Sequence, residues 1–282
     1  MIRLNRPLCL AAALPLLLPL AGCGWNDGPS ITIDGQVYRV SNADWQDGPP
    51  LDGSGVIVPD RREVQVFNEV RLVGPFEVVI DAQPGDPLVT VHCDENISGL
   101  IETAVHRGRL DIQPVGSFRT GTMPRIEVRG DAVTLVRVDG SGSIDVRSIA
   151  TDSFSTQVNG SGDITLLGSA STMHFGVAGS GDIEAAGVAA DSMTIEIAGS
   201  GSVTVAGTTT QLSIGIAGSG DVHGRNLEAG LADVSISGSG DVVIRVRDTL
   251  DASISGSGEV LYVGEPDVNV HINGSGGVHP AQ

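Results

Sequence analysis

The sequence contains no lysine, and all 16 of its basic residues are arginine. A chain without lysine has no Schiff-base amine and no Walker-type phosphate loop, which needs the lysine of its G-K-[ST] segment. Aromatic residues make up only 3% of the 282 residues, so few side chains can serve as platforms for sugar rings. With 34 acidic residues, the net charge is −18 and the pI about 4.4. A chain this acidic is not expected to bind nucleic acid.

Cysteine is also scarce, with three residues in the whole chain. Two of them, Cys9 and Cys23, lie in the N-terminal segment, and only Cys93 remains elsewhere. A single thiol cannot form an internal disulfide. Cys93 ends a run with strand character, Val89–Cys93. We therefore expect it to be a small buried core residue and not a nucleophile.

The N-terminal segment has the organisation of an export signal. Arg3 and Arg6 precede an apolar run of 13 residues, Leu8–Leu20, which is shorter than the ~20 residues that span a bilayer. The segment closes with Leu-Ala-Gly-Cys at Cys23, which resembles the box of bacterial lipoproteins. This resemblance implies a signal peptide over 1–22, lipidation of Cys23 and a membrane anchor. An ordinary secretory signal with a chance cysteine is the alternative.

Residues 23–60 are rich in glycine, proline, aspartate and asparagine and are predicted to form a tether or linker. Two short runs within it, 31–33 and 37–40, flank Asp34-Gly35 and are expected to pair as a small hairpin. Gly24 stands where the lipoproteins that enteric bacteria retain in the inner membrane carry aspartate. The sequence thus predicts an exported protein of the bacterial cell envelope, at the outer membrane on its periplasmic or surface face.

Glycine is abundant, at 39 residues, and a repeat accounts for many of them. The triplet Gly-Ser-Gly occurs eight times at intervals of 18–20 residues, beginning at Gly140, Gly160, Gly179, Gly199, Gly218, Gly238, Gly256 and Gly274. On both sides of each triplet, apolar side chains alternate with small or polar ones. This period of two predicts two strands with one buried face, joined by a glycine corner and followed by a looser turn.

A repeat of this length cannot bury its own apolar face, but stacked repeats can. We therefore predict an all-β protein in which residues 131–282 form a right-handed parallel β-helix of about eight coils of 18–20 residues. Residues 61–130 lack the triplet and are predicted to form irregular N-terminal opening coils or a cap. For the C-terminal end, two arrangements are open: a partner subunit covers it, or Pro280 blunts it.

Several motifs occur in a fixed order along the chain: Val73-Gly74-Pro75-Phe76-Glu77-Val78, Asp94-Glu95-Asn96, Gly108-Arg109-Leu110-Asp111-Ile112 and the run from Ser255 to Gly264. In this order they resemble a known family, the head GIN domain, which is a domain of unknown function labelled "putative auto-transporter adhesin". The resemblance covers about residues 63–275 and implies a bacterial envelope protein with a β-helical fold, often a lipoprotein. It implies no catalytic residue.

An acidic column is the main candidate for chemistry. Five repeats carry a carboxylate three residues after the first glycine: Asp163, Asp182, Asp221, Asp241 and Glu259. On stacked coils these groups would lie about 5 Å apart, where unit charges repel by roughly 1 kcal/mol in water. Each aspartate could cap its own turn through backbone hydrogen bonds, or the column could bind a cation such as calcium weakly. Five interchangeable copies indicate a building rule and not a glycosidase site.

Other candidates are weaker. The triplet serines are equally interchangeable and lack a nucleophile elbow, and no pair of histidines has zinc-ligand spacing. No cofactor is predicted apart from the weakly bound calcium. Five arginines near the opening coils could hold an anionic partner or pair with neighbouring acids: Arg119, Arg125, Arg129, Arg137 and Arg147.

Three functions remain open on the sequence. The first is a non-enzymatic, membrane-anchored envelope lipoprotein that displays a β-helical rod for adhesion or envelope assembly, with a protein or polysaccharide partner. The second is a carbohydrate-binding or carbohydrate-active β-helix protein, which needs a single cleft with acidic and basic residues and an aromatic wall. The third is a structural module that stacks with copies of itself into a homo-oligomer.

Overall fold

The computed structural model describes residues 30–33, 36–39, 49–82, 85–131 and 133–281. The chain divides into two units, Met1–Gly48 and Pro49–Gln282. In the first unit, β1 (Ser30–Ile33) and β2 (Gln36–Arg39) pair in antiparallel fashion, as the predicted hairpin requires. The connecting Asp34-Gly35 and the predicted lipidation site Cys23 lie outside the described residues. Within the described ranges, no helix has the length and apolar character needed to cross a membrane.

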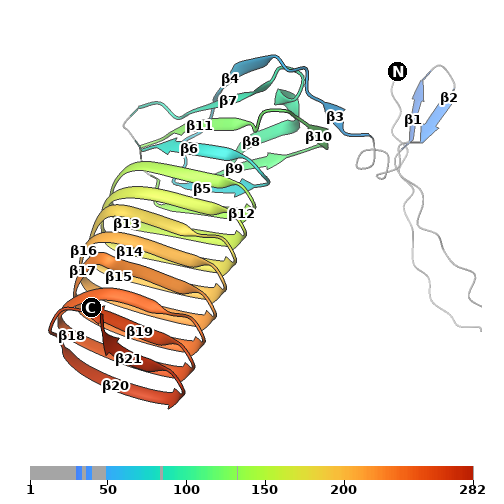
Figure 1. Cartoon of the computed structure of the whole chain (residues 1–282). Helices are drawn as coiled ribbons and strands as arrows, with labels where there is room; N and C mark the ends of the chain where they lie inside the picture. The colour runs from blue at the N-terminus through green and yellow to red at the C-terminus, as the bar shows by residue number, and fades with distance from the viewer. Residues whose placement is uncertain (1–29, 34–35, 40–48, 83–84, 132, 282) are drawn as a thin grey trace, which may run out of the picture. The chain divides into compact units, whose positions relative to one another are not determined.

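The second unit is dominated by a solenoid of parallel strands (Figure 1). The long strands each run from one triplet to the next and pair in parallel with their neighbours, first glycine on first glycine. They are β13 (Ser143–Gly160), β14 (Asp163–Gly179), β15 (Ile183–Gly199), β16 (Ser202–Gly218), β17 (Asp221–Gly238) and β18 (Val242–Gly256). β12 (Leu135–Gly140) precedes them and ends at the first glycine of the first triplet. At the C-terminal end lie β19 (Glu259–Val263), β20 (Asp267–Gly274) and β21 (Gly277–Pro280).

The predicted all-β parallel β-helix is therefore confirmed. It has about 7 turns, because eight triplets bound seven full intervals and the eighth triplet begins a partial turn. The looser turn expected inside each repeat does not interrupt β13 to β18, whereas in the last repeat it separates β19 from β20. Pairing continues around that bend, and the register shifts there, as between Val146 and Ile149 and between Leu166 and Ser169. Neighbouring coils hold the backbone of the bend from both sides.

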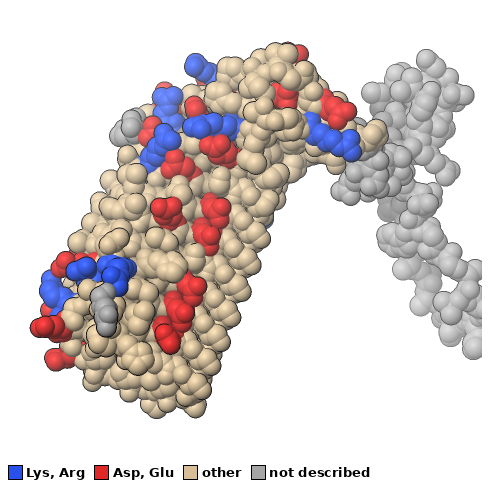
Figure 2. Space-filling model, viewed as in Figure 1, with Lys and Arg blue, Asp and Glu red and all other residues tan. Residues whose placement is uncertain are grey.

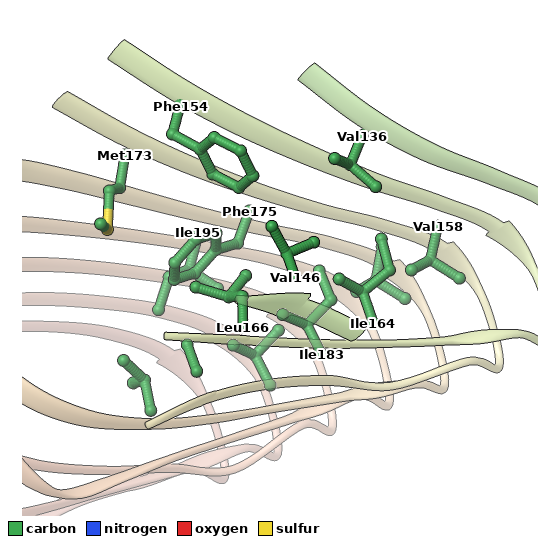
Figure 3. Packing of buried hydrophobic residues seen from close by; sticks show 14 of the residues in the cluster. Val136, Val146, Phe154, Val158, Ile164, Leu166, Met173, Phe175, Ile183 and Ile195 are labelled. Atoms are coloured by element: carbon green, nitrogen blue, oxygen red, sulfur yellow. The ribbon is translucent and has the colours of Figure 1, made fainter. Parts of the chain in front are cut away.

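The interior is filled by columns of like side chains, which point from successive coils toward the axis (Figure 3). Ile164, Ile183 and Val203 form one such column, and each is at most 1% exposed. Phe154 and Phe175 occupy the inner side of the opposite strands and are also buried. The period of two in the sequence thus translates directly into a closed, filled core.

The two glycines of the triplet are required for different reasons. The first glycine has a positive φ in every repeat, as at Gly199 (φ 149°). The second glycine, as at Gly201, has no such backbone, but a Cβ there would stand 2.1 Å from the carbonyl oxygen of Gly181 in the coil before it. The sequence predicts glycine for its turn conformation alone, and the close approach of neighbouring coils is the additional cause.

Two irregular coils precede the first triplet, and they stack out of chain order. One consists of β5 (Glu69–Val73) and β6 (Glu77–Asp81), which pair in parallel with β12 and β13. The other consists of β9 (Arg109–Pro114) and β11 (Arg125–Arg129), which pair in parallel with β5 and β6. The later segment therefore lies farther from the triplet coils than the earlier one.

A cap of antiparallel strands closes this end. β8 (Ile101–His106) pairs with β9, β7 (Leu88–Asp94) with β11, and β4 (Ile57–Glu63) with β7. The predicted irregular coils and the predicted cap are thus both present. No strand covers residues 64–67: β4 ends at Glu63, and Phe67 turns inward and is 2% exposed. Beside the cap, β3 (Leu51–Asp52) and β10 (Phe118–Arg119) form a short parallel pair.

Candidate binding surfaces

The acidic column is a set of hydrogen bonds between coils. The Asp182 carboxylate accepts the backbone N–H and the hydroxyl of Ser202 in the next coil, at 2.8 Å each. The other three aspartates of the column each accept one backbone N–H from the next coil: Asp163 from Asp182 at 3.1 Å, Asp221 from Asp241 at 2.8 Å, and Asp241 from Glu259 at 2.9 Å. Each aspartate thus caps the following turn, whereas the sequence analysis expected it to cap its own.

The column uses aspartate because of its length. Where the position holds serine or glutamate, the N–H of the next coil bonds a glycine carbonyl oxygen instead. After Ser143, the Asp163 N–H donates to the Gly142 carbonyl oxygen at 3.2 Å. After Ser202, the Asp221 N–H donates to the Gly201 carbonyl oxygen at 3.3 Å. After Glu259, the Gly277 N–H donates to the Gly258 carbonyl oxygen, also at 3.3 Å. The carboxylates therefore substitute for a main-chain acceptor, which is a structural role.

Removing one of these caps is expected to have a modest cost. Asp241→Ala should lower the free energy of unfolding by about 1 kcal/mol, because the Glu259 N–H loses its acceptor. Asp241→Asn keeps an oxygen acceptor and should lose less, and Asp241→Glu should behave like Asp241→Ala. Urea unfolding measures all three, with the exposed Asp233→Ala as control. A stabilising Asp241→Ala would show instead that repulsion between neighbouring carboxylates outweighs the hydrogen bond.

The structure provides no ready-made metal centre for the column. In the described part of the chain, no three histidine, cysteine, aspartate or glutamate side chains come together as a metal site. A cation bound at the column would share two neighbouring carboxylates, such as those of Asp221 and Asp241, and would need water for its remaining ligands. The weak calcium site at Asp163, Asp182, Asp221, Asp241 and Glu259 stays a prediction.

The serine column is exposed to solvent along its whole length. Seven of the eight serines donate their backbone N–H to the first glycine of the preceding triplet, as Ser200 does to the Gly179 carbonyl oxygen at 2.9 Å. Their contribution to the corner is therefore made by the main chain. Among the described residues, no side chain that could act as a base is hydrogen-bonded to one of these hydroxyls.

A compact charge cluster that the sequence analysis did not single out lies where the opening coils meet the first triplet coil. Asp139 accepts hydrogen bonds from Arg71 Nε at 2.5 Å, Arg137 Nε at 2.8 Å and Asn159 Nδ2 at 2.8 Å. Burial raises the pKa of Asp139, but the hydrogen bonds from Asn159, Arg137 and Arg71 lower it more, to about 2 from 3.8. The signal in the sequence was Arg137 two residues before Asp139, since alternate residues share a face.

Salt pairing accounts for most of the arginines near the opening coils. Four of the five that were singled out form ion pairs: Arg119 with Asp52, Arg125 with Glu77, Arg137 with Asp139 and Arg147 with Asp145. Arg129 has none within the described ranges. Figure 2 shows basic side chains over the cap and opening coils and again toward the C-terminal coils. The coils between them have no arginine from Ser148 to Gly224.

The remaining candidates are structural. Cys93 is 1% exposed, and burial raises the pKa of its thiol, which makes it the core residue that the sequence predicts. Of the histidines, His92 lies 3.6 Å from Glu127 across neighbouring strands. Phe76, Phe154 and Phe175 are buried. Phe118 stacks on Phe76 with ring centroids 6.3 Å apart.

Two shallow grooves run across the coils of the solenoid. The bend groove, about 680 Å³, follows the bend inside each repeat, along Ala150, Ser169, Ala189 and Thr208. The face groove, about 540 Å³, lies on the strands that lead into the triplets, and its residues include Gln157, His174, Gly176, Glu196 and Gly215. Aromatic side chains line neither groove, so neither has the aromatic wall that the carbohydrate alternative needs.

Comparison with known proteins agrees with this architecture. Residues 66–206 and 175–266 match the family described as "Putative auto-transporter adhesin, head GIN domain". Three crystal structures resemble the chain, and in each comparison 83% of this chain and 100% of the other chain is covered. They are a "putative lipid binding protein" (27% identity, TM-score 0.78) and a "putative adhesin" (22%, 0.78), both from Parabacteroides distasonis, and a "putative adhesin" from Parabacteroides merdae (18%, 0.77).

At 22% and 18% identity, the two structures described as adhesins show the fold alone. No curated protein matches the sequence. The family match, in contrast, reaches from residue 66 to residue 266 and so spans more than half of the chain. On this evidence, the chain belongs to the family "Putative auto-transporter adhesin, head GIN domain".

Proposed function

We propose that the protein is a non-enzymatic, membrane-anchored lipoprotein of the bacterial envelope, whose β-helical rod contacts a protein or polysaccharide partner in adhesion or envelope assembly. The observation that carries the proposal is the uninterrupted ladder of parallel coils with small polar side chains on its outer faces. Such a surface is flat and repetitive. It suits a partner that is itself extended or repetitive more than it suits a small molecule.

Membership in an adhesin family supports an envelope-exposed location. The lipoprotein box at Cys23 supports the anchor, because acyl chains on that residue would hold the protein at a membrane. Incorporation of a labelled fatty acid, lost in Cys23→Ala, tests this part. Against an enzyme stand the interchangeable copies of each candidate residue and the shallow, open form of both grooves.

The face groove is the proposed contact surface. Its floor contains Gly176 and Gly215, where the main chain itself is accessible, and neighbouring coils repeat every ~4.8 Å. Gln157 and His174 line it toward the N-terminal coils, and Glu196 is its charged group. An extended partner lying along the groove would meet backbone groups and small side chains on several coils at once.

Binding assays test the proposal directly. The chain from residue 23 onward, with Cys23→Ser, would be incubated with isolated cell-wall sacculi, a panel of polysaccharides and host matrix proteins. Saturable binding to one class is expected, and Gly215→Trp should abolish it, because no atom lies within 4 Å of a Cβ at Gly215 and the ring would fill the groove. Thr204→Trp, on an exposed site outside the groove residues, is the control.

Each outcome has a consequence. Binding that survives Gly215→Trp would move the contact away from the face groove. Turnover of a bound polysaccharide would support the carbohydrate-active alternative. Absence of binding across the panel, with the protein folded, would contradict adhesion to these polymers.

A further inference from the structure

In the residues that the structure describes, the solenoid is closed at one end and open at the other. At its C-terminal end, β20 pairs only with β18 and β21 only with β19, so the outer edges of both strands are unpaired within the described residues. Val270 and Ile272 are 49% and 39% exposed, whereas Ala252 and Ile254, their counterparts one coil earlier, are 4% and 1% exposed. The end therefore presents core side chains together with a row of free backbone groups.

Beyond its first residue, Asp267, β20 lacks the usual protections of a sheet edge. Exposed edges are commonly blocked by lysine, proline or inward-pointing charges. The segment Val268–Asn273 contains no lysine, proline, aspartate or glutamate. Pro280 stands at the end of β21 and blunts that shorter strand only. An unprotected edge of this kind is a template for further strand pairing.

We infer that this end binds the same end of a second copy of the chain, tail to tail about a two-fold axis. The fold itself selects this arrangement over head-to-tail stacking. At the opposite end of the second unit, β7 and β8 cover the coils in antiparallel pairing. The strand outside β7 is β4, which carries Pro59 and the charged run Asp60–Glu63. Proline and charge protect that edge from further pairing. A C-terminal coil therefore meets an unprotected edge at the same end of a second copy, and the contact closes at two copies.

The sequence of β20 is self-complementary in one antiparallel register. With Val270 on the two-fold axis, Val270 faces Val270 of the partner subunit and Val268 faces Ile272 of the partner subunit. On the outer face, Asp267 faces Asn273 of the partner subunit. Asn269 faces His271 of the partner subunit. This register brings apolar residues together on the inner face and places no two like charges opposite each other.

The size of the end fits a weak, reversible dimer. A turn of 18–20 residues at ~3.3 Å per residue, with ~10 Å between its facing strands, gives an end of roughly 600 Å² including the surrounding backbone and side chains. Two such ends bury about 1,200 Å² in total, which is at the lower limit for specific interfaces. Charge does not oppose the contact, because the last coil carries only Glu265 and Asp267 as acidic residues and no basic residue other than histidine.

Sedimentation velocity on the chain from residue 23 onward, with Cys23→Ser, tests the inference over a wide range of concentrations. A reversible monomer–dimer equilibrium is expected. Val270→Glu should weaken the dimer by at least about a hundredfold, because it places two carboxylates opposite each other in an apolar contact. The matched control is Leu167→Glu, since Leu167 is also 49% exposed but lies on the side of the solenoid.

Cross-linking keeps the test independent of any fraying caused by Val270→Glu. Val270→Cys should form an intermolecular disulfide on oxidation, since directly opposite residues of antiparallel strands come within reach of one, and Leu167→Cys should not. A protein that is monomeric at all concentrations would overturn the inference. So would a dimer that tolerates Val270→Glu, growth into filaments, or a dimer that is lost when residues 24–48 are removed. These results are independent of the binding panel proposed above.

Discussion

Gly199→Ala is expected to destabilise the protein by more than about 4 kcal/mol, or to prevent it from folding. Gly199 is the first glycine of the fourth triplet and has φ 149°, a conformation that residues with a Cβ rarely adopt. The new Cβ would also lie 2.2 Å from the carbonyl oxygen of Gly179. That oxygen accepts the N–H of Ser200 at 2.9 Å, so the coils would have to separate and this hydrogen bond would be lost.

The cost is large because the solenoid cannot relax at one coil alone. Gly199 is paired with Gly179 on one side and Gly218 on the other, in continuous parallel strands. Moving one corner outward strains the pairing of both neighbours. Backbone strain of about 1–3 kcal/mol therefore adds to the loss of inter-coil contacts.

The same substitution on the next strand, β16, provides the control. Gly215 has no positive φ, and a Cβ at this position would meet no atom within 4 Å. Gly215→Ala should therefore change stability by less than about 1 kcal/mol, with stabilisation the expected sign, because glycine weakens a strand interior. Urea or thermal unfolding compares the two variants. Similar stability of the two variants would show that the glycine corner can accept a Cβ, which would contradict the prediction.

The second large effect is expected at Asp139. Asp139→Asn should lower the free energy of unfolding by about 2 kcal/mol at pH 7, because Arg71 and Arg137 lose the charge they share. The Asp139 side chain is only 18% exposed, so solvent screens this interaction incompletely. Asparagine keeps the shape of the side chain and one oxygen acceptor, as a protonated carboxyl group does. The variant therefore removes the charge together with the hydrogen bond accepted by the other oxygen.

The effect has a defined pH dependence. The pKa of Asp139 is about 2 in the folded protein and about 3.9 in an unfolded chain. A lowered pKa contributes stability that is fully present above pH ~4 and is lost as the pH falls toward ~2. Unfolding measured at intervals from pH 7 to pH 2 should therefore show the native protein and the Asp139→Asn variant converging at the acid end.

Asp248→Asn is the control for this experiment, because the Arg247–Asp248 pair is exposed to solvent and exposed pairs contribute little. Its stability curve is expected to follow that of the native protein. A constant difference between the native protein and Asp139→Asn at all pH values would show that packing, and not charge, accounts for the loss at this position.

The sequence predicted the repeated half of the fold in detail, because its signal is repeated eight times in register. Each column of apolar residues can be identified from the sequence alone. Ile164, Ile183 and Val203 are buried in the core, as their alternation with polar residues predicts. Burial of Cys93 followed from its strand context in the same way.

The opening coils were not predictable to the same degree. β9 and β11 stack beyond β5 and β6 although they follow them in the chain, and no local pattern encodes that order. The Asp139 cluster was missed for a related reason, since Arg71 and Asp139 meet only after β5 and β12 have paired. The aspartate column was found, but its partner coil was not, because a single repeat does not show which neighbour lies within reach.

The parallel pairing of successive coils also determines how the rod would respond to force. The hydrogen bonds between coils run along the rod. Tension applied to the two ends of the chain would therefore pull the coils apart one turn at a time. Each turn of 18–20 residues that peels away would release about 60 Å of chain. The protein would then lengthen in nearly equal steps at a nearly constant load, while the turns not yet reached remained folded.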